Sequence, residues 1–178
     1  EHYTYDPDNP NGLSFNGLNT MYQDRTGILW IPTWGGGLNK LGHAKKFVNY
    51  RNRSNDPNSL SSAIVNDLAE DNSGNLWIVG SAGLDKLERQ TDTFTFTHYT
   101  HDPNDPTSLF SNRVDGIAMD RDGILWISTM DGLGKFNPRT ETFIRYRHDP
   151  NDPGSLIYND LEYVFADSSG LVWISSYS

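Results

Sequence analysis

Apolar side chains along this chain fall into short groups, and Gly, Pro, Asp or Asn separates each group from the next. Within a group the apolar residues are mainly Trp, Ile, Val, Leu and Tyr, of which the aromatic and β-branched types favour strands. Turn-forming residues recur about every 10 residues, which is too often for helices of ordinary length. The pattern therefore predicts an all-β protein made of many short strands, with almost no helix.

The same pattern recurs four times, and a tryptophan marks each copy. Every copy reads Asp-x-x-Gly-x-x-Trp-Ile, and successive Trp residues of this motif are 47, 49 and 47 residues apart. The motif residues are Trp30, Trp77, Trp126 and Trp173, with Asp24, Asp71, Asp120 and Asp167 and with Gly27, Gly74, Gly123 and Gly170. Self-similarity at a period of about 40 to 50 residues indicates repeated units of a few strands each.

Two further signatures keep the same spacing. A Leu precedes each of these Trp residues by 17 positions, and a Tyr precedes that Leu by ten: Leu13, Leu60, Leu109 and Leu156, with Tyr3, Tyr50, Tyr99 and Tyr146. The motif Gly-Leu-x-Lys-[Leu/Phe] follows at residues 37–41, 83–87 and 132–136. The repeat thus extends well beyond the tryptophan segment.

One repeat shows how the pattern divides into strands. Residues 112–120 lead into the Asp-x-x-Gly of residues 120–123, in which Asp at the first position and Gly at the fourth suit a type I turn. Residues 124–129 are mostly apolar on both faces, as in a strand buried between neighbouring sheets. Residues 132–136 and 142–147 complete a four-stranded antiparallel unit, the blade of a β-propeller.

We therefore predict a β-propeller fragment of four-stranded antiparallel blades, about 3.7 repeats long. Residues 14–53, 61–101 and 110–148 are expected to form blades, residues 1–6 the outer strand of a preceding blade, and residues 157–178 the first two strands of an incomplete blade. A closed ring needs about four to eight blades, and an open arc exposes strand edges. We expect the remaining blades of a longer parent chain, or a second copy in a homo-oligomer, to close the ring.

Composition and charge exclude several classes of protein. Lys and Arg number 14 against 23 Asp and Glu, a net charge of -9 that repels phosphate backbones and anionic lipid, so no nucleic acid partner is expected. Cysteine is absent, which excludes a disulfide framework and thiolate chemistry. No apolar run approaches the length of a membrane span, so we expect no membrane contact by this segment.

Once the repeats are aligned, they closely resemble the two-component regulator propeller repeat. That repeat reads Asn-x-Val-x-x-Ile, then Asp-x-x-Gly-x-Leu-Trp-Ile, then Gly-Gly-Leu-Asn-Lys-Phe. The connection Tyr-x-x-Asp-Pro-x-[Asn/Asp]-Pro-x-Ser-Leu resembles the version found in the periplasmic sensor region of hybrid two-component system histidine kinases. Residues 32–34 stand where Gly-Thr is usual, and Ser128 and Ser175 replace a glycine, which concerns loop details only.

The resemblance implies a seven-bladed propeller and a ligand-sensing segment of a hybrid two-component signal transduction sensor, with oligosaccharides as the expected ligands. It also implies a periplasmic location, in the extracytoplasmic region of an inner-membrane protein. A histidine kinase domain would lie in a part of the parent protein outside this sequence. One alternative is a structural or protein-interaction propeller scaffold, and another is an enzyme similar to the propeller-fold streptogramin lyases.

Candidate ligand contacts are sought where the repeat varies. Four residues beyond each motif Trp lies a hairpin-loop position that holds Trp34, Ser81, Met130 and Tyr177. Large apolar side chains at a loop apex point to a ligand or an interface, so Trp34, Tyr177 and Met130 are candidates. A second variable column, expected in the innermost strands near one mouth of the central channel, holds Gly17, Ile64, Arg113 and Asp160. Arg113 and Asp160 could hydrogen-bond a polar ligand.

The sequence offers no catalytic or metal-binding group. His101 and His148 share one repeat column and His2 and His98 another, which indicates architecture, and none of them has an evident paired base or nucleophile. The Asp-Pro segments lack the ligand spacing of a calcium loop and suit ordinary turns. The Asp and Gly of the tryptophan motif are expected to form hairpin turns, and its Trp to pack between blades. We therefore expect no catalysis, no metal and no cofactor.

Overall fold

The computed structural model describes residues 2–89 and 94–176, and in that part of the chain every regular element is a strand. The strands are β1 (Tyr22–Gln23), β2 (Leu29–Pro32), β3 (Leu38–Leu41), β4 (Phe47–Tyr50), β5 (Val65–Glu70), β6 (Leu76–Gly80), β7 (Gly83–Arg89), β8 (Phe94–Tyr99), β9 (Val114–Met119), β10 (Leu125–Thr129), β11 (Gly132–Asn137), β12 (Thr142–Tyr146), β13 (Leu161–Ala166) and β14 (Val172–Ser176). Within the same residues there is no helix of the length and apolarity needed to cross a membrane.

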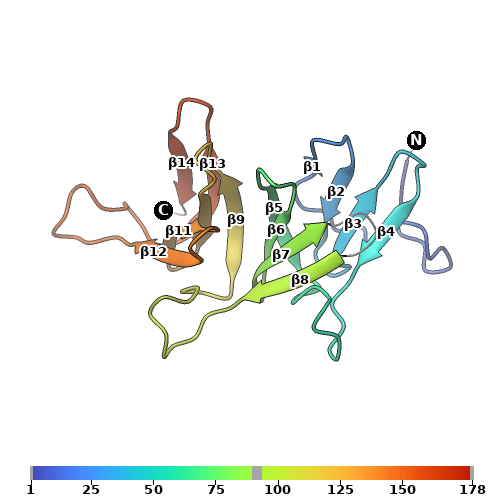
Figure 1. Cartoon of the computed structure of the whole chain (residues 1–178), viewed down its shortest axis with the longest axis horizontal. Helices are drawn as coiled ribbons and strands as arrows, with labels where there is room; N and C mark the ends of the chain where they lie inside the picture. Colours follow the sequence, from blue (N-terminus) through green and yellow to red (C-terminus); the bar gives the residue numbers. More distant parts are fainter. Residues whose placement is uncertain (1, 90–93, 177–178) are drawn as a thin grey trace.

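The strands form sheets in chain order, as the repeat predicts. β1–β4, β5–β8 and β9–β12 are four-stranded antiparallel sheets, and β13 and β14 pair as a two-stranded one. The sheets stand side by side along the chain, and the innermost strand β9 lies between β5 and β13 (Figure 1). This is the blade arrangement of a β-propeller, so the predicted fold class is confirmed. The blade boundaries given above stay a prediction.

Each blade is tied together by the aspartate of its tryptophan motif. In the β5–β6 turn, one carboxylate oxygen of Asp71 accepts the backbone N–H groups of Ser73 (2.8 Å) and Asn75 (2.9 Å). The other oxygen accepts the indole N–H of Trp77 at 3.0 Å. Gly74 has φ of 85°, a left-handed conformation that glycine adopts without strain. Equivalent indole bonds form in the other three blades, so one carboxylate fixes both the turn and the ring.

The tryptophans pack between blades wherever a following blade covers them. Trp30 packs with residues of β5 and β6, and Trp77 with residues of β9 and β10; both are fully buried. Trp126 is partly buried against β13, whereas the side chain of Trp173 is 59% exposed. The last position differs because no described strand lies beyond β14. A lysine from the neighbouring strand lies over each of the first three rings, Lys40, Lys86 and Lys135.

Ring contacts also join the outer edges of successive blades. Tyr50, at the end of β4, meets Phe94 of β8 with ring centroids 5.4 Å apart, and the equivalent contact joins Tyr99 to Phe143. Tyr3 meets Phe47 in the same way at 5.3 Å. Residues 2–6 form no named strand, and their place as the outer strand of a preceding blade stays a prediction.

A buried ion-pair network joins the first two blades. Arg89, at the end of β7, donates to Asp24 in the β1–β2 turn and to Glu70 at the end of β5, each at 2.5 Å. Its third bond goes to the carbonyl oxygen of Gly74 at 2.6 Å. The two carboxylate side chains are 0% and 2% exposed. One guanidinium thus compensates two buried carboxylates, and Glu70 has a second, longer ion pair with Arg25 at 3.8 Å.

Candidate functional site

The variable positions gather on one face of the arc. In an up-and-down blade the hairpins between the second and third strands lie at the same end as the connections to the next blade. Residues 33–37, 80–83 and 129–132 and the residues just before β5, β9 and β13 make up this end, called here the hairpin face. In Figure 1 the β5–β6 turn points up, while the connections after β4 and β8 lie low, toward the hairpin face.

Trp34 is the largest exposed side chain of the hairpin face. Its indole is 64% exposed, and Phe15 and Ile64 are about two-fifths exposed. The Trp34 backbone N–H donates to the Gly17 carbonyl at 3.0 Å, and Trp34 forms an isolated bridge with Ile64 of the next blade. Trp34 therefore stands at the junction of two blades, within an apolar surface that also includes Phe15 and Ile64.

Hydrogen bonds from a buried side chain stabilise the hairpin that carries Trp34. The hydroxyl of Thr33 is fully buried; it donates to the Gly37 carbonyl at 2.8 Å and accepts the Gly36 N–H at 3.0 Å. Because both bonds close on the loop itself, they fix the backbone that carries the exposed indole. A preorganised loop loses little backbone entropy when a ligand binds.

The equivalent positions of the next blades differ in character. Ser81 shares a hydrogen bond of 2.7 Å with Ser62, so the second hairpin presents hydroxyl groups beside the apolar surface. Met130 is 48% exposed. The fourth position, Tyr177, lies outside the described residues. The hairpin face thus changes from aromatic to polar to aliphatic along the arc.

The second variable column lies slightly outside its predicted place. Ile64, Arg113 and Asp160 each come one residue before an innermost strand, not within it, because hydrogen bonding with the second strand begins only at the next residue. Arg113 pairs with Asp115 at 3.3 Å. Burial raises the pKa of Asp115, as do Asp160 and Glu162, while Arg113 opposes the rise. In the described residues no hydrogen bond or ring contact joins this charged group to Trp34.

Asp67 connects its own strand β5 to the first and third blades, a role the sequence did not reveal. Its carboxylate accepts the Thr20 hydroxyl at 3.0 Å from the first blade and the Ile117 N–H at 3.1 Å from the third. Burial raises its pKa more than these bonds lower it. The available signal was a lone charge in a column whose other members are Thr20, Gly116 and Tyr163.

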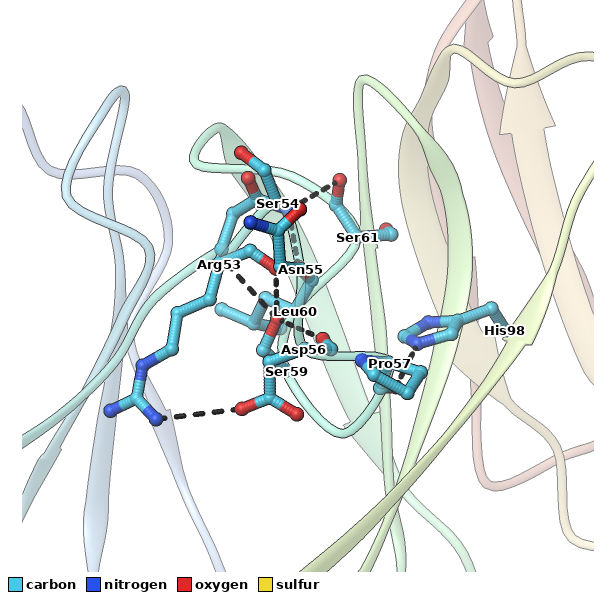
Figure 2. A pocket seen from close by; sticks show the side chains of 10 residues that line it. Arg53, Ser54, Asn55, Asp56, Pro57, Ser59, Leu60, Ser61 and His98 are labelled. Carbon is cyan, nitrogen blue, oxygen red and sulfur yellow. Dashed lines mark hydrogen bonds and ion pairs between the residues drawn. The ribbon is translucent and has the colours of Figure 1, made fainter.

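Ser61, Asp85 and His98 form a polar cluster beside the connection after β4. Ser61 and His98 line a pocket of about 430 Å³ whose other lining residues are 52–57, 59 and 60 (Figure 2). One oxygen of Asp85 accepts the Ser61 hydroxyl at 3.0 Å, and the other lies 2.7 Å from Nδ1 of His98. Nε2 of His98 faces the Pro57 carbonyl at 2.9 Å. The sequence analysis assigned His98 to a repeat column but did not predict its contacts with Asp85 and Pro57.

The order of these three groups differs from that of a hydrolase triad. Catalysis by serine requires a histidine nitrogen on the serine hydroxyl and a carboxylate behind the histidine. Here the carboxylate stands between the two, so His98 does not reach the Ser61 hydroxyl. Elsewhere in residues 2–89 and 94–176, no group of three or more His, Cys, Asp or Glu side chains is placed to hold a metal ion.

Comparison with a family model identifies two segments of the chain. Residues 59–82 and 108–131 match the family described as "Two component regulator propeller". Each segment runs from the end of a connection through the tryptophan motif to the hairpin face. No curated protein matches the chain in sequence.

Solved structures share the fold at low sequence identity. Two structures of the extracellular domain of BT4673 from B. thetaiotaomicron, titled as a one component and as a hybrid two component system, superpose with TM-scores of 0.75 and 0.73 at 22% identity. They cover 97% and 93% of this chain but only 22% and 21% of their own lengths. Virginiamycin B lyase from Staphylococcus aureus superposes at 0.65 with 14% identity, over 98% of this chain and 52% of the lyase. The chain spans about a fifth of the BT4673 domain, and at these identities the likeness concerns the fold.

Proposed function

We propose, from the premise that this chain contains two-component regulator propeller repeats, that it is a ligand-sensing segment in the extracytoplasmic region of a hybrid two-component signal transduction protein. The matched repeats and the fold shared with the BT4673 extracellular domain support this role. In this proposal the segment lies in the periplasm. Signal output belongs to domains elsewhere in the parent protein, including its histidine kinase.

The hairpin face is the ligand-binding surface in this proposal, and an oligosaccharide is the ligand. The observation that carries it is the exposed indole of Trp34, which stands on a hydrogen-bonded hairpin at the junction of two blades. An aromatic face suits the apolar C–H face of a sugar ring, and hydroxyl groups such as those of Ser62 and Ser81 suit its polar rim. Met130, Arg113 and Asp160 are the further contacts proposed, with Tyr177 as a sequence-based candidate.

Binding without catalysis is the second part of the proposal. The arrangement of Ser61, Asp85 and His98 supports it, because the histidine does not contact the serine hydroxyl as it would in a hydrolase triad. The likeness to virginiamycin B lyase is a likeness of fold, and one fold supports many activities.

Isothermal titration of the intact sensor region with a panel of plant, host and microbial oligosaccharides tests the proposal. One member of the panel should bind, and Trp34→Ala should weaken that binding at least about tenfold, or 1.4 kcal/mol. The matched control is Ile144→Ala, which removes a side chain of similar exposure (53%) from the outer strand β12 and should leave affinity unchanged. Binding that survives Trp34→Ala would remove the hairpin face from the proposal.

A scaffold function is the outcome to expect if the intact region binds no sugar. Exposed aromatic side chains also serve protein interfaces, where Trp is enriched. In that case Trp34 should be buried against another domain or chain, and Trp34→Ala should weaken that association instead.

We further propose that other blades complete the ring beside β14. Trp173 and Phe165 expose about three-fifths of their surface on this flank. Further blades of the parent chain, or a second copy of this chain, would cover them. Light scattering after gel filtration of this chain should show self-association, and a stable, non-aggregating monomer would contradict closure by a second copy.

A further inference from the structure

Three blades place different residue pairs at one cross-strand position between their third and outer strands. The pair is neutral in the first blade, titratable in the second and permanently cationic in the third: Asn39 with Asn49, Asp85 with His98, and Gly134 with Arg145. The fold therefore accommodates all three residue pairs. The Asp85–His98 pair is the one whose charge changes near neutral pH.

The hydrogen bonds of His98 require one more proton than a neutral imidazole carries. Nδ1 lies 2.7 Å from Asp85 Oδ1, and Nε2 lies 2.9 Å from the carbonyl oxygen of Pro57. Asp85 Oδ2 already accepts the N–H and the hydroxyl of Ser61, at 2.9 and 3.0 Å. A carbonyl only accepts, and neutral imidazole has a single N–H. Both bonds of His98 thus form only when the Asp85–His98 pair holds an extra proton.

We propose that Asp85 and His98 form a proton-dependent clamp on the connection after β4. The protonated pair holds Pro57 against β8, and loss of the proton releases it. The remaining N–H stays with the carboxylate, because a charge-assisted bond is stronger than one to a neutral carbonyl. The lone pair of Nε2 then faces the Pro57 oxygen and repels it. Figure 2 shows His98 directed at Pro57 across one side of the pocket.

The connection held by the clamp leads directly into the hairpin face. This connection continues into Ser62 and Ile64, which contact Ser81 and Trp34. Release of Pro57 would therefore reach the hairpin face through the backbone of residues 58–64. The clamp itself does not depend on the proposed function, since its contacts and its test involve no ligand.

The charged groups around His98 come from two neighbouring elements. Strand β7 supplies Asp85, and the connection supplies Arg53 and Asp56, which pair with each other at 3.5 Å. Strand β8 adds only the titratable Tyr99. Burial lowers the pKa of His98, but its bonds to Asp85 and Pro57 and the charge of Asp85 outweigh this and raise it above 6.5. The stabilisation is complete below 6.5 and is lost as the pH rises through the raised pKa.

NMR titration of the histidine rings in the unmodified chain, from about pH 5 to 8, tests the clamp without mutation. His98 should titrate above 6.5, with both ring nitrogens protonated at the acid end. The backbone amide shifts of residues 53–59 should follow the same curve. A pKa at or below 6.5, or a connection that does not respond, would overturn the proposal.

The first blade supplies a matched variant. Asp85→Asn combined with His98→Asn copies the Asn39–Asn49 pair and removes the titration. In urea unfolding, the free energy of the wild-type chain should fall as the pH rises through the His98 pKa, and the double variant should lose this fall. His101→Asn is the control: it copies Asn52 of the preceding repeat and removes a ring with one described bond, 2.8 Å from Nδ1 to the Leu109 oxygen. A double variant that keeps the wild-type pH dependence would contradict the clamp.

Discussion

Replacing Arg89 with methionine should destabilise the chain more than its single charge suggests. The substitution keeps much of the aliphatic volume but leaves Asp24 and Glu70 buried without their shared cation. Removing one partner of a buried ion pair costs about 3–5 kcal/mol. Asp24 keeps the bonds from Thr26 and Trp30, so we expect the lower end, about 3 kcal/mol.

The loss is measured by urea or thermal unfolding at neutral pH. For a chain of this length, about 3 kcal/mol corresponds to a fall in Tm of about 6–12 °C. Arg53→Met is the control, because Arg53 is 73% exposed and its pair with Asp56 should contribute about 0–1 kcal/mol. Adding Glu70→Gln to Arg89→Met removes one stranded charge and should recover part of the loss.

Acid unfolding gives an independent check of the same network. Burial alone would raise the pKa of Asp24, but hydrogen bonds from Thr26, Trp30 and Arg89 hold it well below its ordinary 3.8. A depressed pKa stabilises the fold above 3.8, and this stabilisation is lost as the pH falls through the folded pKa. Arg89→Met should therefore begin to unfold at a higher pH. An Arg89→Met chain with the stability of Arg53→Met would refute the reasoning.

Three further experiments test other parts of the fold. Gly80→Ala should destabilise the chain by several kcal/mol, because the new Cβ would lie 2.1 Å from the Ile64 backbone oxygen. In Gly42→Ala the new Cβ meets no atom within 4 Å, so this control should be neutral. Urea unfolding compares the two variants. Trp77→Ala should cost about 3–5 kcal/mol, and Trp173→Ala much less, since only the first ring is buried; equal costs in calorimetry would contradict this. Because the pKa of Asp67 is raised, the free energy of unfolding should fall as the pH rises from 3.8 through that pKa. Unfolding curves measured over a series of pH values should show this fall in the wild-type chain and not in Asp67→Asn.

Much of the fold could be predicted because the same strand and turn pattern occurs four times in the sequence. A strictly spaced Asp, Gly and Trp needs the same turn in each copy, and the structure joins the indole to the aspartate in all four. The bond from the indole to the aspartate was not foreseen, although a spacing of six residues across a tight turn brings the two together. Repetition reveals that a residue is architectural but not which atoms it contacts.

The candidate site was less accessible from the sequence, because its residues are the ones that break the repeat. Variation at Trp34 indicated a functional position, and the structure shows its exposure and its rigid hairpin. The pairing of Asp85 with His98 was hidden, because Asp85 shares its column with Asn39 and Gly134, and His98 shares its column with His2, Asn49 and Arg145. Only the cross-strand register joins them, and sequence spacing alone does not fix which residues of a long connection turn toward an outer strand. Arg89 likewise reaches a turn 65 positions away.

The burial of each motif indole depends on the next blade along the chain, so the two ends of the arc are not equivalent. The ring of one blade is sheltered by the innermost strands of the blade that follows, so every unit relies on its successor for the burial of its largest side chain. Loss of order is then expected to start with β13 and β14 and to travel backward toward the amino terminus, one blade at a time. In such a chain, native-state hydrogen exchange would read as a gradient, with protection weakest at Trp173 and strongest around Trp30 and Trp77.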